Sequence, residues 1–267
     1  MNVTLLAYTP QPEKVVAAAA KLCYSNAGIG ELLDSISDGS AAAFLQRLSD
    51  YGHQSPAEHV SFTFGIEGIS RACLAQLTRH RLASFSVQSQ RYVNQSAANA
   101  GGADAKIIVP PSIAEDGEAS EAFAQAVKTV RYAYDHLHKV LEDKFTYELT
   151  HDAFALDEDT ARKKAKKLAN EDARFILPEG SETRLIVTMN ARELNHFFKL
   201  RCCNRAQWEI RAVADEMLKL VYPIAPNLFK DAGPGCVAGK GCTEGSMSCG
   251  YPVSTREKYK KLKEAFS

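Results

Sequence analysis

This chain is organised around the stretch Arg79-His80-Arg81-Leu82-Ala83-Ser84-Phe85-Ser86-Val87-Gln88-Ser89-Gln90-Arg91-Tyr92. The stretch holds three arginines, one histidine, three serines and two glutamines, and it has no acidic residue. A protein core could not bury so many hydrogen-bond donors without partners, because each unpaired polar group costs free energy. A solvated surface would normally mix in acids. The composition therefore favours a bound anion that also offers hydrogen-bonding edges, such as a nucleotide.

The composition of the whole chain limits the class of protein. With 267 residues, 45% of them hydrophobic and 24% charged, it is typical of a globular protein with one large or two small domains. Basic and acidic residues are equal in number, at 32 each, so the net charge is zero. A general nucleic-acid-binding protein normally carries a basic excess. Any cationic site in this chain is therefore local.

Targeting signals and cysteine usage favour the cytoplasm. Residues 1–16 lack the basic and long apolar regions of a secretory signal. The apolar run Val15–Ala20 is too short to span a membrane, so no membrane partner is expected. An odd number of cysteines, seven, favours reduced thiols in a cytosol.

The C-terminal tail, from about residue 231, is rich in glycine and cysteine. Cys236, Cys242 and Cys249 supply three thiols without an obvious fourth ligand or close metal-ligand spacing. A loop is favoured there, and no metal site is expected.

Hydrophobic periodicity predicts both strands and helices. The expected strands are Val3–Tyr8, Val60–Glu67, Lys106–Val109 and Arg184–Met189. The expected helices are Pro12–Tyr24, Ser40–Tyr51, Ser70 to about His80, Glu118–Lys144, Asp159–Ala173, a helix capped by Asn190, and Ala206–Tyr222. Side-chain caps are expected at Ser40, Ser55, Ser70, Asp159 and Asn190, with Glu58 and Glu193 as capping-box partners of Ser55 and Asn190.

The helix that Asn190 caps separates basic from apolar side chains. One face carries Arg192, His196 and Lys199, and the opposite face carries Leu194, Phe197 and Phe198. Arg201 falls at the centre of the apolar face and needs a partner, because burying an unpaired guanidinium is costly. That partner is either Glu209 in an ion pair or a planar ligand whose carbonyl oxygens the guanidinium contacts.

An ordered set of short blocks resembles the flavin-dependent thymidylate synthases. The signature of that family is Arg-His-Arg, seven residues and Ser, which Arg79 to Ser89 match. Flanking blocks match in the same order, from about residue 50 to residue 212. They are Gly52-His53 to His59, Ser89-Gln90-Arg91-Tyr92, Asn190-Ala191-Arg192, and Arg201 to Gln207-Trp208-Glu209-Ile210.

The resemblance implies an α+β fold, with a mixed, mainly antiparallel sheet packed with long helices, in a single domain over residues 1–267. It implies a FAD-dependent methyltransferase that converts dUMP to dTMP in dTMP biosynthesis. The carbon donor would be 5,10-methylenetetrahydrofolate, the hydride carrier FAD and the reductant NADPH. The implied assembly is a homotetramer whose active sites are shared between subunits. Such a flavin site does not need the dinucleotide-binding glycine loop, which this chain lacks.

The resemblance also implies ligands, position by position. The FAD-binding residues would be Ser55, Arg79, His80, Arg81, Asn190, Arg192 and His196. The dUMP-binding residues would be Gln76, Arg79, Gln88, Ser89, Gln90, Arg91, Arg174 and Arg201. Arg201 would also be catalytic, because it would stabilise the uracil ring deprotonated at N3 and make C5 a better nucleophile. His53 would lie on the folate or flavin side.

Two positions depart from the usual family pattern. Val87 stands where many members have Glu or Gln, and it cannot hydrogen-bond, so Gln88 would take that role. His196 stands where many members have Asn, a change that keeps a donor. Ser89 would be a dUMP ligand rather than a nucleophile, because no general base is assured beside it.

Two other functions stay open from the residues alone. An NADPH-oxidising flavoprotein that does not methylate uracil would turn over without dUMP. A nucleic-acid-binding module would use the arginine stretch, although the zero net charge argues against it.

Overall fold

The computed structural model describes residues 1–96, 106–153, 155–238 and 241–266. The chain divides into two compact units. The first unit comprises Met1–Glu67, Ala75–Ser86 and Leu185–Ser267, and the second comprises Gly68–Leu74 and Val87–Arg184. The single domain expected over residues 1–267 stays a prediction. Within the described residues, no helix is long and apolar enough to cross a membrane.

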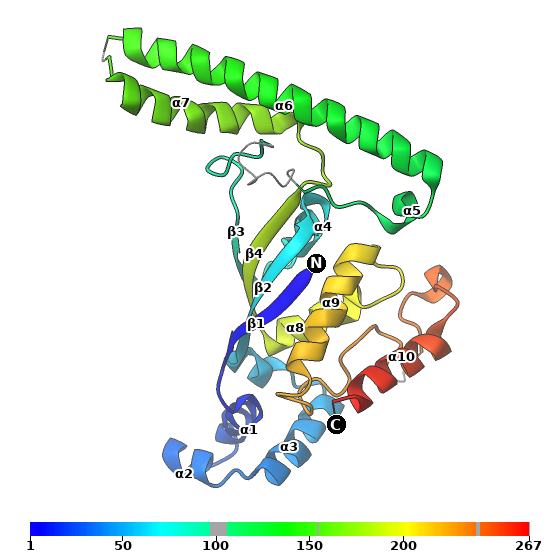
Figure 1. Cartoon of the computed structure of the whole chain (residues 1–267). Coiled ribbons are helices and arrows are strands. Elements are labelled where there is room, and N and C mark those ends of the chain that lie inside the picture. The colour runs from blue at the N-terminus through cyan, green and yellow to red at the C-terminus, as the bar shows by residue number, and fades with distance from the viewer. Residues whose placement is uncertain (97–105, 154, 239–240, 267) are drawn as a thin grey trace. The chain divides into compact units, whose positions relative to one another are not determined.

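A four-stranded sheet has the strand order β1-β2-β4-β3 (Figure 1). Its strands are β1 Asn2–Tyr8, β2 Ser61–Ser70, β3 Ala83–Val87 and β4 Glu182–Asn190. β1 runs antiparallel to β2, with Leu5 opposite Phe64. The two-residue period of β2 buries Phe62, Phe64 and Ile66 completely, as its sequence predicts. The expected α+β fold, with an antiparallel sheet and long helices, is confirmed.

The helices of the first unit bury an aromatic core. They are α1 Pro12–Leu22, α2 Ile29–Asp34, α3 Asp38–Asp50, η1 Ser55–His59, α8 Ala191–Arg201, α9 Trp208–Val221, η3 Gly245–Met247 and α10 Pro252–Glu264. The Phe229 ring lies 5.5 Å from the Phe62 ring and 6.0 Å from the Phe198 ring. Phe198 in turn lies 5.9 Å from Phe197. Each fully buried phenylalanine contributes about 1.5–3 kcal/mol relative to an exposed one, so this cluster holds α8 against the sheet.

The second unit is dominated by two helices that lie side by side (Figure 1). They are α6 Gly117–His151 and α7 Glu158–Ala173; α5 Pro111–Ala114 and η2 Arg174–Ile176 flank them. The buried face of α7 is a row of alanines four residues apart, which lets the α6 backbone approach closely. Ala161, Ala165, Ala169 and Ala173 are at most 1% exposed.

Several expected caps are wrong by a few residues. Ser37, rather than Ser40, caps α3 by accepting a hydrogen bond from the Ser40 backbone N–H. Asp157, rather than Asp159, caps α7 by accepting a hydrogen bond from the Thr160 backbone N–H. In both helices another polar residue, three positions earlier in α3 and two positions earlier in α7, satisfies the same rule, so the pattern alone does not choose between them. The expected cap at Ser55 is also wrong, because η1 has no side-chain cap.

Other expected elements change length or type. α4 Arg71–Leu77 ends before Arg79, although Ser70 caps it as predicted. The expected strand Lys106–Val109 is reduced to one bridge between Ile107 and Ser181. Elements that the sequence analysis did not expect include β3 and α10. β3 is a five-residue strand in a polar stretch, and none of its residues is fully buried. The buried residues of α10, Thr255, Tyr259 and Lys263, are mostly polar.

Candidate active site

In the first unit, α8 carries both ends of a buried polar chain. The Nε atom of Arg201 donates to Nε2 of His80 at 3.0 Å. Nδ1 of the same ring lies 2.8 Å from Oε1 of Glu193. His80 and Glu193 are each only 5% exposed. His80 therefore connects the first turn of α8 to its last residue.

The hydrogen-bond directions define the protonation of His80. A guanidinium N–H can only donate, so Nε2 of His80 is the unprotonated nitrogen. The neutral ring then carries its proton on Nδ1 and donates it to the Glu193 carboxylate. Burial lowers the pKa of His80 below its ordinary value; the hydrogen bond to Glu193 raises it, and the charge of Arg201 lowers it again. The lowered pKa agrees with the neutral ring that the geometry requires.

Local structure explains how α8 presents these groups. The Asn190 side chain caps the helix by accepting a hydrogen bond from the Glu193 backbone N–H at 2.8 Å, as predicted. The Glu193 side chain, expected in a capping box, turns to His80 instead. Phe197, from the buried face of α8, meets the His80 ring edge-on at 4.9 Å and 77°. The ring is therefore oriented by packing as well as by hydrogen bonds.

The other residues expected at FAD lie on the surface of the first unit. Arg192 and His196 are exposed on α8, and Arg192 forms an ion pair with Glu58. Arg79 and Arg81 are exposed after the end of α4. Ser55 and His53 are exposed at η1 and just before it. His80 differs from this group, because it is buried and both its ring nitrogens already have protein partners.

A second cluster lies in the second unit. The Nη2 atom of Arg91 lies 2.8 Å from Oε2 of Glu171. Arg174 Nε donates to the Glu171 backbone oxygen at 3.1 Å. Glu171 therefore brings together two arginines that are far apart in the sequence and were both expected at dUMP. Arg91 Nε and Gln90 Nε2 are buried and have no hydrogen-bond partner among the described residues.

Two neighbouring residues in the same stretch, Ser89 and Gln88, have hydrogen-bond partners within the second unit. The Ser89 hydroxyl accepts a hydrogen bond from the Arg91 backbone N–H at 3.2 Å. With its amide oxygen turned toward Arg184, Gln88 accepts from Nε at 2.9 Å and from Nη2 at 2.8 Å. Gln76, a further residue expected at dUMP, is half-buried in α4 of the first unit. The structure thus divides the expected dUMP ligands between the two units.

Sequence reasoning missed four polar partners of these residues. They are Glu58, Glu171, Arg184 and the side chain of Glu193. Glu58 and Glu193 were assigned to capping boxes, and Glu171 and Arg184 stand in a helix and a strand with no local signal. Each partner contact joins segments that only the fold brings together.

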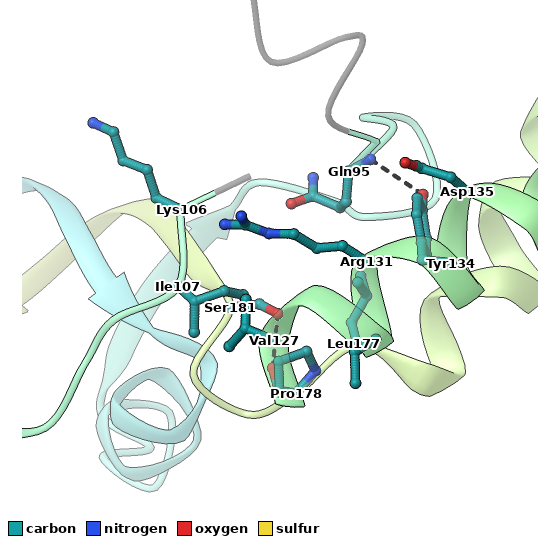
Figure 2. Close-up of a pocket in the computed structure, with 11 residues that line it drawn as sticks. Gln95, Lys106, Ile107, Val127, Arg131, Tyr134, Asp135, Leu177, Pro178 and Ser181 are labelled. Atoms are coloured by element: carbon teal, nitrogen blue, oxygen red, sulfur yellow. Dashed lines mark hydrogen bonds between the residues drawn. The ribbon is translucent and has the colours of Figure 1, made fainter. Parts of the chain in front are cut away.

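A small enclosed cavity in the second unit is distinct from both clusters (Figure 2). Its volume is about 10 Å³, which suits about one water molecule and no larger ligand. Arg131 and Tyr134 from α6 line it, and the Tyr134 hydroxyl accepts a hydrogen bond from the Gln95 backbone N–H at 3.1 Å (Figure 2). None of the expected site residues lines this cavity.

The cysteine-rich tail surrounds another small cavity, in the first unit. Cys236, Cys242 and Cys249 line it, and the structure adds Cys203, which sequence reasoning had left out. Burial raises the pKa of the Cys236 thiol, and the nearby thiols add to that shift. Over the described ranges, no group of three or more cysteine, histidine or acidic side chains is placed to hold a metal ion.

Known proteins resemble this chain along most of its length. The model of a family described as thymidylate synthase complementing protein matches residues 4–227, a wider span than the blocks from about 50 to 212. A flavin-dependent thymidylate synthase of Clostridium tetani is 48% identical over 259 residues, covering 97% of each chain. One from Geobacter sulfurreducens is 46% identical over 262 residues, covering 98% of this chain and 99% of that protein.

A solved structure is similar in fold. The Helicobacter pylori flavin-dependent thymidylate synthase, crystallised with FAD and dUMP, aligns with a TM-score of 0.58 at 23% identity. The alignment covers 87% of this chain and all of that one, 100%.

Fold and clusters together define an α+β protein with arginine-bearing surfaces suited to anionic, hydrogen-bonding ligands. The chain belongs to the family of the flavin-dependent thymidylate synthases.

Proposed function

We propose that this protein is a thymidylate synthase that methylates dUMP to dTMP. It takes the one-carbon unit from 5,10-methylenetetrahydrofolate and reducing equivalents from NADPH, with FAD as the hydride carrier. The observation that carries the proposal is the 48% identity to a flavin-dependent thymidylate synthase along 97% of the chain. The hydrogen bond between Arg201 and His80 agrees with this activity, because it orients a guanidinium that could stabilise an anionic uracil ring.

The donors of the first unit fit an anionic dinucleotide. Arg79, Arg81 and Arg192 expose their guanidinium groups. One guanidinium can bind two oxygens of a phosphate at the same time. Ser55, Asn190 and His196 would add hydrogen-bonding groups. His80 would act mainly by orienting Arg201, because both its ring nitrogens are engaged.

The second unit would supply the nucleotide phosphate site. Buried donors without partners, at Arg91 Nε and Gln90 Nε2, suit an incoming anion. Ser89, Gln88 and Arg174 complete this set in the second unit. Gln76, Arg79 and Arg201, which belong to the first unit, are also proposed as dUMP ligands. The proposed assembly is a homotetramer with active sites shared between subunits.

Arg201 would act on the uracil ring. A guanidinium beside the ring carbonyls stabilises negative charge that develops when N3 loses its proton. This interaction strengthens as the ring becomes anionic, so it promotes attack by C5 and raises kcat more than it lowers KM. His53 would face the folate or the flavin.

One experiment tests the proposal directly. The purified protein is incubated with dUMP, methylenetetrahydrofolate, NADPH and FAD, and dTMP is measured with each component omitted in turn. The proposal requires dTMP in the complete mixture and little in each omission. NADPH oxidation without dTMP, independent of dUMP, would instead identify the non-methylating flavoprotein. Salt-dependent RNA or DNA binding without flavin would favour the nucleic-acid module.

A reducing compartment, the cytoplasm, is proposed as its location. All seven cysteines are free in the structure, which agrees with the expectation of reduced thiols.

A further inference from the structure

Glu193 has an inward-facing carboxylate that the proposed chemistry does not use. It stands in the first turn of α8, where a carboxylate normally faces the free backbone N–H groups. Its side chain instead lies 6% exposed against His80, with Oε1 2.8 Å from Nδ1. Burying a carboxylate is costly unless its hydrogen bonds are satisfied, so a specific contact holds it there.

We propose that Glu193 is a positioning residue for Arg201 and that it acts through His80. Its carboxylate holds the ring in the tautomer with the proton on Nδ1, so that Nε2 accepts from Arg201 and orients the guanidinium. This inference rests on the proposed function, because it assigns Glu193 a part in the step that Arg201 performs.

The geometry explains why the ring must be held in one tautomer. Arg201 Nε lies 3.0 Å from His80 Nε2, so a proton on Nε2 would set two donors against each other. A neutral histidine carries its proton on either nitrogen, and the group opposite the other nitrogen decides which. Glu193 accepts at Nδ1 and therefore selects the productive form.

The two nitrogens of one imidazole ring link Glu193 to Arg201. Glu193 Oε1 lies 2.8 Å from Nδ1 and Arg201 Nε lies 3.0 Å from Nε2, so the carboxylate can fix the ring that orients the guanidinium. The Phe197 ring packs edge-on against the same imidazole, with the ring centroids 4.9 Å apart, and restricts its rotation.

The arrangement has a pH signature. The charged and titratable groups that face His80 are Glu193, Arg201 and His196. When the pH falls through the lowered pKa of His80, Nε2 takes a proton and stops accepting from Arg201, so kcat falls on the acid side. Glu193 raises the pKa of His80, so its removal lowers that pKa further. The acid limb of the kcat profile should therefore move to lower pH in a Glu193 variant.

The test compares Glu193→Ala and Glu193→Gln with Glu216→Gln, a matched control on α9 whose carboxylate pairs with Lys219. Steady-state kinetics, flavin content and thermal melting are measured for each. We expect kcat to fall about 10- to 100-fold in Glu193→Ala, the range for losing a hydrogen bond to a charged group. KM for dUMP and the flavin content should stay near wild type. Glu193→Gln, which keeps the shape of the side chain, should lose less of its kcat. Its kcat profile should show the acid limb at lower pH than in wild type.

A structural readout tests the tautomer without activity. In protein with ¹⁵N-labelled histidine, the His80 signals, assigned by their loss in His80→Asn, should report a proton on Nδ1. Glu193→Gln should mix the two tautomers, because an amide both donates and accepts. This measurement still decides the proposal if Glu193→Ala does not fold.

The outcomes separate the two proposals. If wild-type protein forms no dTMP, the proposed function fails, and the tautomer measurement stands alone. If wild type forms dTMP while both Glu193 variants keep its kcat and acid limb, only the role of Glu193 fails. A loss of activity that follows loss of folded protein, with an unchanged pH profile in Glu193→Gln, would make Glu193 merely structural and overturn the proposal.

Discussion

The Tyr259 hydroxyl, on α10, lies 2.9 Å from the carbonyl oxygen of Cys202, the residue that follows Arg201. The same hydroxyl lies 2.5 Å from Oδ1 of Asp215 on α9. Tyr259 is fully buried. The C-terminal helix therefore anchors the backbone beside the proposed catalytic arginine, although the tail carries no part of the family signature.

Replacing Tyr259 by phenylalanine should destabilise the protein. The change leaves Cys202 and Asp215 with one fewer donor, which costs about 1–3 kcal/mol. Denaturant unfolding, followed by circular dichroism, measures the loss. Tyr251→Phe, at a side chain that is 67% exposed, is the matched control and should unfold as wild type. Equal stability of the two variants would show that the Tyr259 hydroxyl contributes nothing.

Arg201→Ala should retain FAD and lose dTMP formation. The guanidinium is proposed to act on the uracil ring, so kcat should fall at least 100-fold, about 3 kcal/mol of transition-state stabilisation. Flavin absorbance and dTMP yield are measured on the same preparation. Arg162→Ala, at a half-exposed arginine of α7 paired with Glu158, is the control and should remain active. Normal turnover of Arg201→Ala would refute the catalytic assignment.

Arg91→Ala and Arg174→Ala should weaken dUMP binding instead. Each variant loses a charge-assisted contact worth about 1.5–3 kcal/mol, so KM for dUMP should rise about 10- to 100-fold. Flavin content should not change, because both residues lie in the second unit. Initial rates at varied dUMP concentration measure KM and kcat for each variant. A drop in kcat at unchanged KM would contradict the proposed role in dUMP binding.

Lys263 gives a prediction about pH and stability. Burial lowers its pKa from 10.5 to about 8, with the Asp231 charge opposing that shift. Below pH 8 the folded and unfolded chains both carry the proton, so this group adds no pH dependence. Between about pH 8 and 10.5 the unfolded chain holds a proton that the folded chain has released. The free energy of unfolding should therefore rise with pH in this window, by up to about 3 kcal/mol.

Lys263→Met isolates this contribution. The variant should lack the rise between pH 8 and 10.5, when unfolding is measured under reducing conditions across that range. Lys260→Met, at a largely exposed lysine of the same helix, should keep the rise. Parallel curves for wild type and Lys263→Met would contradict the shifted pKa.

Local patterns predicted those elements whose signal lies within a few residues. The alternation in β2 and the cap at Asn190 were both found, because neighbouring residues decide them. The caps expected at Ser40 and Asp159 were wrong because another polar residue stood two or three positions earlier. β3 was missed because it is short, lies in a polar stretch and buries no side chain completely, and α10 because its buried residues are mostly polar, so tertiary packing places both.

Some features of the candidate site can likewise be predicted from the sequence, whereas others depend on the fold. The arginine stretch, the basic face of α8 and the need of Arg201 for a partner follow from residue types and helical spacing, which the sequence contains in full. The sequence does not show that His80 is a partner of Arg201. His80 and Glu193 are 113 residues apart, and His80 and Arg201 are 121 apart. Contacts at such separation depend on how α8 packs against the chain that follows α4, so only the tertiary structure could place a neutral histidine between a buried carboxylate and the arginine.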